Sequence, residues 1–111
     1  MSQYLFSYGT LQREDLQLKL YGRILEREAD YLQGFLLKRI KITDEKFLST
    51  GESDWQNTLC ETNDINDTVP GTVLSLTTEE LAITDAYEPT GYRRITVTLR
   101  SGKKAWLYIT G

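Results

Sequence analysis

The sequence predicts a strand-dominated α+β domain, built as a small curved sheet or barrel with two short helices on its outside. Alternation of apolar and polar residues, the period of a strand, recurs near both ends of the chain, while helical spacing is confined to two short segments. The chain has 111 residues, the length of one domain, and shows no repeat or internal linker. We therefore expect residues 1–111 to form a single domain.

The amino-terminal third predicts a strand, a helix and a bent extended segment. Residues 4–8 alternate between the two faces of a strand and run into a glycine turn. Residues 14–24 carry leucine and isoleucine at helical spacing, which predicts a short helix that Gly22 can end. Residues 26–43 mix charged and apolar side chains and predict extended chain bent around Gly34.

The middle of the chain is less regular. Residues 44–68 are polar and rich in turn formers, so we expect a long loop with one short strand near residues 57–61. Trp55 in this loop would either pack the loop down or act as a lid over a cavity. Residues 69–76 predict a better strand, because apolar and polar side chains alternate after a proline at its start.

The carboxy-terminal third predicts a capped helix followed by a hairpin. The Thr-x-x-Glu pattern that starts at Thr77 has the form of a capping box, and the helix must stop before Pro89. Residues 92–99 and 104–109 alternate cleanly. Ser101-Gly102 between them is a turn signal, so these segments are expected to pair as a hairpin.

Composition narrows the chemistry that the protein can perform. Histidine is absent and Cys60 is the single cysteine, which excludes Ser-His and Cys-His catalysis and nearly every zinc or iron site. Any catalytic base must be a carboxylate, a lysine or a tyrosine, and we expect no metal and no cofactor. A lone thiol forms no internal disulfide, so we expect Cys60 to be a small buried residue in a reducing compartment.

Charge and hydropathy limit the partners. The formal net charge of −3 has the wrong sign for a phosphate backbone, so no nucleic-acid partner is expected. The apolar runs fall far short of the roughly 20 residues that span a bilayer, and the first residues lack a basic leader region. We expect a soluble cytoplasmic protein with no membrane partner, and the oligomeric state is left open.

The first candidate site is the turn Tyr8-Gly9-Thr10-Leu11, which follows a predicted strand directly. A glycine here lets successive backbone N–H groups turn toward one point without a Cβ in the way. Such a turn can bind a carboxylate or an oxyanion. An ordinary strand-to-loop turn would read the same, so this segment alone does not decide between the two.

The second candidate site is Glu88, which lies at a predicted helix end between Tyr87 and Tyr92. A carboxylate among aromatic rings loses hydration and its pKa rises, which suits proton transfer near neutral pH. We expect Asp85 nearby to be ionised and to be held by an arginine or by backbone amides. The alternative is a solvated glutamate in a loop, with Tyr87 in the core.

Together the two segments carry the motifs of a known family. Residues 5–11 fit the pattern L/F-x-x-Y-G-T-L, and residues 85–94 fit D-x-Y/F-E-x-x-x-Y-x-R. The sequence resembles the gamma-glutamylcyclotransferase-like family, whose bacterial and plant branch is often called AIG2-like. Its motifs look closest to the gamma-glutamylamine cyclotransferases. Gln33-Gly34-Phe35 and the strand that starts at Val69 extend the resemblance over nearly the whole chain.

The resemblance implies a small mixed β-barrel of five or six strands with short flanking helices and a cavity for a gamma-glutamyl group. It implies that Tyr8, Gly9, Thr10 and Leu11 are substrate-binding residues and that Glu88 is the catalytic general base. The expected reaction is a cyclisation of the acyltransferase or lyase type. It converts a gamma-glutamyl amide or gamma-glutamyl amino acid to 5-oxoproline and a free amine by attack of the α-amine, without a metal or cofactor.

Substrate preference and turnover are not fixed by the motifs. Pro89 stands where the family commonly has glycine, and Glu14 replaces another glycine, so the preferred leaving group is not inherited. One alternative is a small-molecule-binding or regulatory module of the same fold without turnover. A protein-interaction domain using the acidic segment 61–67 is another. Glu88 favours the enzyme, because a pocket that only binds an anionic glutamyl group gains nothing from an extra carboxylate.

Overall fold

The structure is a computed structural model that describes residues 2–110. Its strands are, in chain order, β1 (Ser2–Ser7), β2 (Glu26–Gln33), β3 (Phe35–Lys41), β4 (Trp55–Glu61), β5 (Thr68–Thr77), β6 (Tyr92–Thr98) and β7 (Lys104–Thr110). The helices are a 3-10 turn, η1 (Thr10–Gln12), and the α-helices α1 (Glu14–Tyr21), α2 (Glu45–Leu48) and α3 (Thr78–Tyr87). The strand-dominated α+β class is therefore confirmed.

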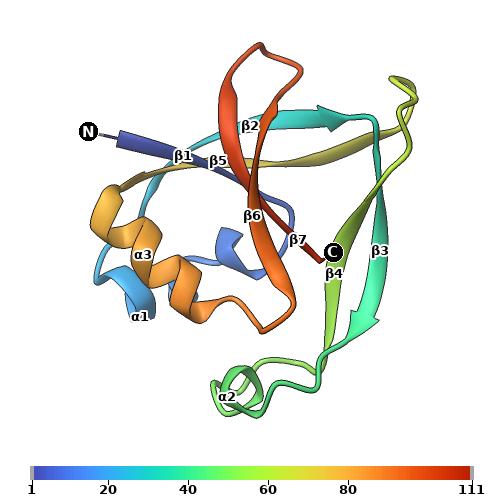
Figure 1. Cartoon of the computed structure of the whole chain (residues 1–111). Coiled ribbons are helices and arrows are strands. Elements are labelled where there is room, and N and C mark those ends of the chain that lie inside the picture. The colour runs from blue at the N-terminus through green and yellow to red at the C-terminus, as the bar shows by residue number, and fades with distance from the viewer. Residues whose placement is uncertain (1, 111) are drawn as a thin grey trace.

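The strands form two sheets, which differs from the predicted barrel of five or six strands. The larger sheet has the order β2-β5-β1-β7-β6, and β3 and β4 form a separate antiparallel ribbon (Figure 1). Gly34 adopts a φ of 84°, which turns the chain sharply after β2, so that β3 leaves the large sheet and pairs with β4. A closed barrel is not confirmed by this pairing among residues 2–110.

The large sheet has β1 at its centre. β1 runs antiparallel to β5 and parallel to β7, and β6 and β7 form the predicted hairpin. Figure 1 shows α1 and α3 on one side of this sheet and the β3–β4 ribbon standing on the other. Because β1 is paired on both edges, the residue that follows it starts from a fixed position in the molecule.

Two apolar cores lie on opposite faces of the large sheet. Successive β1 residues point to opposite faces, so Leu5 packs with the helices and Phe6 packs between the sheet and the ribbon. Full burial of such a side chain contributes about 1.5–3 kcal/mol. The core between sheet and ribbon comprises Phe6, Leu32, Phe35, Leu59, Val69, Val73, Leu99, Ala105, Leu107 and Ile109. The core under the helices comprises Leu5, Leu11, Leu16, Leu25, Leu74, Leu76, Leu81 and Tyr108.

β5 and β1 approach each other closely at Gly71. A Cβ placed on this residue would lie 2.5 Å from a ring carbon of Phe6 and 2.6 Å from the carbonyl oxygen of Ser7. Such distances are shorter than van der Waals contact, so only glycine fits here without a shift of backbone. The end of β1, where the chain turns into Tyr8, is therefore held tightly against β5.

The helix ends follow the expected local chemistry. α1 stops at Gly22, which has the left-handed φ of 73° typical of a helix C-terminus. At α3 the side chain of Thr77 accepts from the amide of Glu80 at 3.1 Å, and the Glu80 carboxylate accepts from the amide of Thr77 at 2.9 Å. This capping box and the stop before Pro89 are confirmed. Within residues 2–110 the structure contains no helix long and apolar enough to cross a membrane.

The expectation for Cys60, in the middle of the chain, is wrong. Cys60 is exposed rather than buried. The preceding residue of β4, Leu59, faces the core, and Cys60 lies on the other face of the strand, where Thr58 is covered through its hydrogen bonds with Thr110 but Cys60 is open to solvent. Trp55 is 49% exposed at the start of β4, and the guanidinium of Arg39 lies 5.4 Å from its ring centroid.

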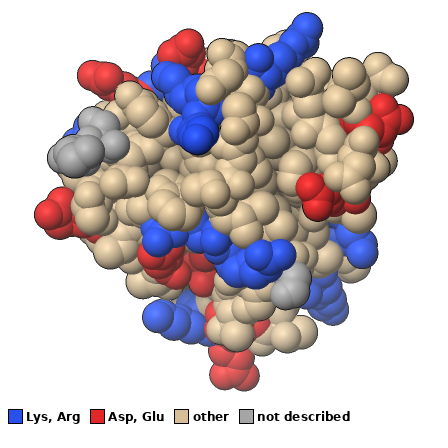
Figure 2. All heavy atoms as spheres, turned by 45° about the horizontal axis from the view of Figure 1, so that its top comes forward, with Lys and Arg blue, Asp and Glu red and all other residues tan. Residues whose placement is uncertain are grey.

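On the face drawn in Figure 2, basic and acidic side chains are interspersed with uncharged ones.

Candidate active site

A cavity opens where the end of β1, the turn after α3 and the β3–β4 connection meet. Its empty volume is about 470 Å³ including its open mouth. The lining residues are Leu5, Phe6, Ser7, Tyr8, Gly9, Thr10, Leu11, Phe47, Gln56, Asn57, Glu88, Pro89, Tyr92 and Tyr108. The structure thus brings the two sequence motifs, which are almost eighty residues apart, to the walls of one cavity, whereas Trp55 does not line it.

A buried glutamine side chain holds the loop after β1 in place. Gln17 of α1 is fully buried, and its Nε2 donates to the carbonyl oxygen of Leu11 at 2.8 Å. The Oε1 of the same side chain accepts from the amide of Leu25 at 2.9 Å. Leu11 itself is 4% exposed and belongs to the core under the helices. This role of Gln17 could not be predicted from the sequence, because its two partners lie in other segments.

The backbone N–H groups of the loop after β1 can donate hydrogen bonds to a ligand. Among the hydrogen bonds of residues 2–110, none uses the amides of Gly9, Thr10 or Leu11 as donor. The Thr10 hydroxyl lies 3.1 Å from the hydroxyl of Tyr87, and the Gly9 carbonyl accepts from Nε2 of Gln12 at 3.2 Å. Three successive amides beside the cavity are therefore free to bind an anionic or carbonyl oxygen of a ligand.

Tyr8 contributes a neutral phenol to the cavity. Its hydroxyl donates to the backbone carbonyl of Tyr108 at 2.6 Å. Burial, together with the nearby Tyr92 and Glu88, raises the pKa of Tyr8 far above its ordinary value. Burial and Glu88 also raise the pKa of Tyr92 to about 12, and the Tyr92 hydroxyl donates to the carbonyl of Asn57 at 2.8 Å. Both phenols therefore stay protonated at neutral pH.

Glu88 lies at the carboxyl end of α3, where its amide donates to the carbonyl of Thr84 at 3.0 Å. Its carboxylate makes no hydrogen bond or ion pair with another residue in the described part of the chain. Burial, and to a smaller extent the charge of Asp85, raise the pKa of Glu88 from 4.5 to about 8. A carboxyl group with this pKa exchanges protons readily near neutral pH.

Asp85, one turn before Glu88, is held by two neighbours. The hydroxyl of Tyr108 donates to its Oδ1 at 2.5 Å, and Nη1 of Arg94 lies 3.4 Å from its Oδ2. The Arg94 guanidinium in turn stacks over the ring of Trp106 at 4.3 Å. Nη1 of Arg94 is buried and has no hydrogen-bond geometry to any described residue, so its contact with Asp85 is an ion pair. The expected arginine partner of Asp85 is therefore present.

The wall opposite the Tyr8–Leu11 loop comes from the connection between β3 and β4, residues 42–54, and from the start of β4. Its lining residues are Phe47, Gln56 and Asn57. All three lie within residues 44–68, which were expected to be a long loop with one short strand near residues 57–61, and the α2 helix in this segment was not predicted. The one available signal was a large apolar residue, Phe47, in an otherwise polar stretch.

Solved structures of known proteins share this fold. A protein of Arabidopsis thaliana solved in solution has a TM-score of 0.72 at 20% identity, over 99% of this chain and 62% of that chain. A gamma-glutamyl cyclotransferase has a TM-score of 0.74 at 18% identity, over 100% of this chain and 68% of that chain. An uncharacterized human protein has a TM-score of 0.72 at 19% identity, over 99% and 67%. The chain thus spans 62% to 68% of the length of these proteins.

At these identities the structural likeness shows the fold alone. No curated protein sequence matches the chain. The family is shown by a different comparison, in which residues 5–111 match the family described as gamma-glutamyl cyclotransferase, AIG2-like. The match covers both walls of the cavity and nearly the whole sequence. The chain belongs to the gamma-glutamyl cyclotransferase, AIG2-like family.

Proposed function

We propose that this protein converts a gamma-glutamyl amide or gamma-glutamyl amino acid to 5-oxoproline and a free amine. The observation that carries the proposal is the meeting of Glu88 with the free amides of Gly9, Thr10 and Leu11 at one cavity. Family membership supports the same class of reaction. The proposed reaction takes place in a single domain and uses neither a metal nor an organic cofactor.

In the proposed mechanism the substrate reacts with itself. The amides of the Tyr8–Leu11 loop bind the glutamyl group and stabilise negative charge on the γ-carbonyl oxygen. The α-nitrogen then attacks the γ-carbonyl carbon, and a C–N bond forms while the bond to the leaving amine breaks. Holding the substrate folded makes this five-membered ring closure far more frequent than in solution.

Glu88 moves the protons in this scheme. The attacking α-ammonium nitrogen loses two protons to become the lactam nitrogen, and Glu88 passes them in turn to the departing amine. The amine leaves as an ammonium ion, so no net proton is taken up or lost. The Glu88 pKa of about 8 is close to that of an α-amino group, which makes the transfer nearly balanced in free energy. An ordinary carboxylate, with a pKa of 4.5, would be a weaker base by several orders of magnitude.

The lining also fits a substrate with a carboxylate on the glutamyl side. No lysine or arginine is among the lining residues, so the α-carboxylate would be bound by backbone amides and by neutral hydroxyls. Tyr8 and Tyr92 are raised in pKa and stay protonated, which avoids a second negative charge beside the substrate. The Thr10 hydroxyl is a further neutral partner.

The direct test is to incubate the protein with gamma-glutamyl amides and gamma-glutamyl amino acids and to measure 5-oxoproline by mass spectrometry. Glu88→Gln keeps the shape of the side chain but cannot accept the ammonium proton, so we expect kcat to fall by at least about 10² with the fold unchanged. Glu79→Gln, on the exposed face of the same helix, is the matched control and should leave kcat unchanged.

Three outcomes would contradict the proposal. If Glu88→Gln kept wild-type turnover on a confirmed substrate, Glu88 would not be the base. Binding of gamma-glutamyl amides without any 5-oxoproline would favour a non-catalytic binding module. Unfolding of Glu88→Gln, seen as loss of circular dichroism, would assign Glu88 a structural role instead.

A further inference from the structure

We propose that Phe47 of α2 is a specificity-determining residue that limits the width of the leaving amine. This inference rests on the proposed function, since it concerns the part of the substrate that departs. Four observations carry it: the division of the cavity lining, the packing of Phe47, the attachment of the connection that bears it, and the hydrogen bonds of two polar groups in the same wall.

The lining leaves one side of the cavity for the leaving amine. Leu5, Phe6 and Ser7, at the end of β1, line the cavity next to the Tyr8–Leu11 loop. This loop and Glu88 would contact the glutamyl group. The amine attached to the γ-carbonyl would then lie against the remaining part of the lining, the wall that contains Phe47, Gln56 and Asn57.

Phe47 is fixed in this wall. It is 3% exposed, and its ring lies 5.4 Å from that of Tyr87 with an interplanar angle of 58°. The Oδ2 of Asp44, which caps α2, accepts from the amide of Thr90 at 2.8 Å and from its hydroxyl at 3.1 Å. The start of α2 is therefore fastened to the turn that follows Glu88.

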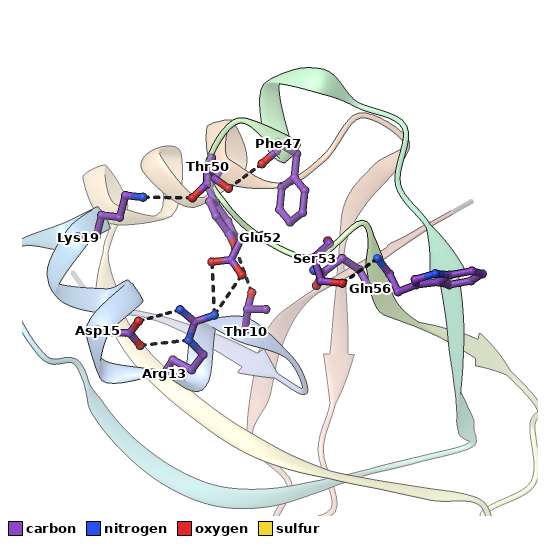
Figure 3. A network of polar contacts seen from close by, with 11 residues as sticks. Thr10, Arg13, Asp15, Lys19, Phe47, Thr50, Glu52, Ser53 and Gln56 are labelled. Atoms are coloured by element: carbon purple, nitrogen blue, oxygen red, sulfur yellow. Dashed lines mark hydrogen bonds and ion pairs between the residues drawn. The ribbon is translucent and has the colours of Figure 1, made fainter.

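The far end of the connection is attached to α1 and the residue before it. Nη1 of Arg13 lies 3.1 Å from Oε2 of Glu52, and Nζ of Lys19 donates to the carbonyl of Thr50 at 3.4 Å. The hydroxyl of Thr50 donates to the carbonyl of Phe47 at 2.6 Å. Figure 3 shows this network, with the ring of Phe47 pointing from α2 toward the loop that carries Thr10.

Two polar groups of the same wall are already hydrogen-bonded. Nε2 of Gln56 donates to the carbonyl of Ser53 at 2.8 Å, and the backbone carbonyl of Asn57 accepts from the Tyr92 hydroxyl. Phe47 thus lines this wall with a bulky apolar side chain. The contacts at both ends of α2 prevent the side chain from moving aside. Such a pocket wall discriminates between ligands that differ by a methylene by about 10- to 200-fold.

The test compares three substrates whose leaving amines have similar basicity and different width: the gamma-glutamyl amides of methylamine, n-butylamine and cyclohexylamine. For the wild type we expect kcat/KM for the cyclohexylamide to be lowest. Phe47→Ala should raise the ratio of kcat/KM for cyclohexylamide over methylamide by about tenfold or more, and Phe47→Trp should lower it. Phe47→Leu, which keeps an apolar side chain in place, gives a smaller rise if Phe47→Ala does not fold.

Ile42→Ala is the matched control. Ile42 is 5% exposed in the same connection but does not line the cavity, so its loss should leave the substrate ratio unchanged. An unchanged ratio in all three Phe47 variants, with an active wild type, would overturn this inference and leave the proposed function standing. A wild type that forms no 5-oxoproline from any of the three amides would overturn both.

Discussion

The two walls of the cavity are held in place by different means. The Tyr8–Leu11 wall continues directly from β1, which pairs with β5 and β7. The backbone carbonyl of Leu11 in this wall accepts a hydrogen bond from the buried side chain of Gln17. The wall opposite belongs to residues 42–54, which join two strands of a separate ribbon. Side-chain contacts of Asp44, Phe47 and Glu52 attach it to the rest of the molecule.

This difference separates the two tasks of the cavity. The wall that would bind the common glutamyl group follows directly from the central strand of the large sheet, so changing it disturbs the core. The wall that would face the variable amine is attached by a few side-chain contacts outside the large sheet, so its sequence can change while the sheet stays intact. Position in the fold would therefore separate the proposed chemistry from the proposed specificity within one cavity.

Gly71→Ala should displace the Tyr8–Leu11 wall and cause the largest loss of stability among the variants proposed for the two walls. The added methyl group would lie within 2.6 Å of the Ser7 carbonyl and closer still to the Phe6 ring, so β1 must shift away from β5. We expect unfolding free energy to fall by about 3 kcal/mol and Tm by more than about 10 °C, measured by urea and thermal denaturation.

Gly9→Ala is the control for this prediction, because an added Cβ there meets no atom within 4 Å. Its effect on stability should be much smaller. Equal losses in the two variants would show that the contact of β5 with the end of β1 does not hold the first wall.

The first wall and the helix that ends at Glu88 could be predicted from the sequence because their signals are local. Alternation up to Tyr8, the turn at Gly9, the capping box at Thr77 and the stop before Pro89 each depend on neighbouring residues. The motif resemblance then related the loop to Glu88, and the structure brings them to one cavity. No local pattern could have shown the buried Gln17.

The second wall could not be predicted for a physical reason. α2 spans only Glu45–Leu48, too short to show helical periodicity, and it is held by partners such as Thr90 that lie far away in the sequence. Strand pairing is also a long-range property, which is why β3 and β4 forming a ribbon of their own was missed. Cys60 was expected to be buried but is exposed, because the sequence alone does not show which face of β4 it lies on.

The pH dependence of the free energy of unfolding should show whether the Glu88 carboxylate is poorly solvated between the two walls. The pKa of Glu88 is about 8 in the folded protein against an ordinary 4.5, so the unfolded chain binds fewer protons between these values. Wild-type unfolding free energy should therefore fall as pH rises from about 4.5 to about 8 relative to Glu88→Gln. Because the side chain faces an open cavity, we expect a difference of roughly 2 kcal/mol at pH 9 and almost none at pH 4.

Urea denaturation of both variants across this range is the measurement, and Glu79→Gln is the control, which should follow the wild type. A Glu88→Gln variant whose stability advantage did not grow with pH would show that the carboxylate is well solvated. The walls would then leave Glu88 as an ordinary surface acid.

Asp44→Ala should loosen the second wall alone, with the smallest effect on the whole molecule. The change removes the acceptor for the Thr90 amide and hydroxyl and for the Lys46 amide, so residues 44–54 lose their contact with the turn after α3. We expect amide hydrogen exchange in residues 44–54 to speed up by about threefold to tenfold, with β1 and β5 unchanged.

The wild type should show the same loosening at low pH. The Thr90 amide holds the pKa of Asp44 below its ordinary 3.8, so this contact is complete above that value and is lost as pH falls through the lowered pKa. Asp64→Ala removes a comparable acceptor, that of the Asn66 amide, in a turn outside the cavity and should leave residues 44–54 protected. If Asp44→Ala instead exposed β1 and β5 to exchange, the two walls would unfold as one unit, and attachment through surface contacts would not explain how the second wall is held.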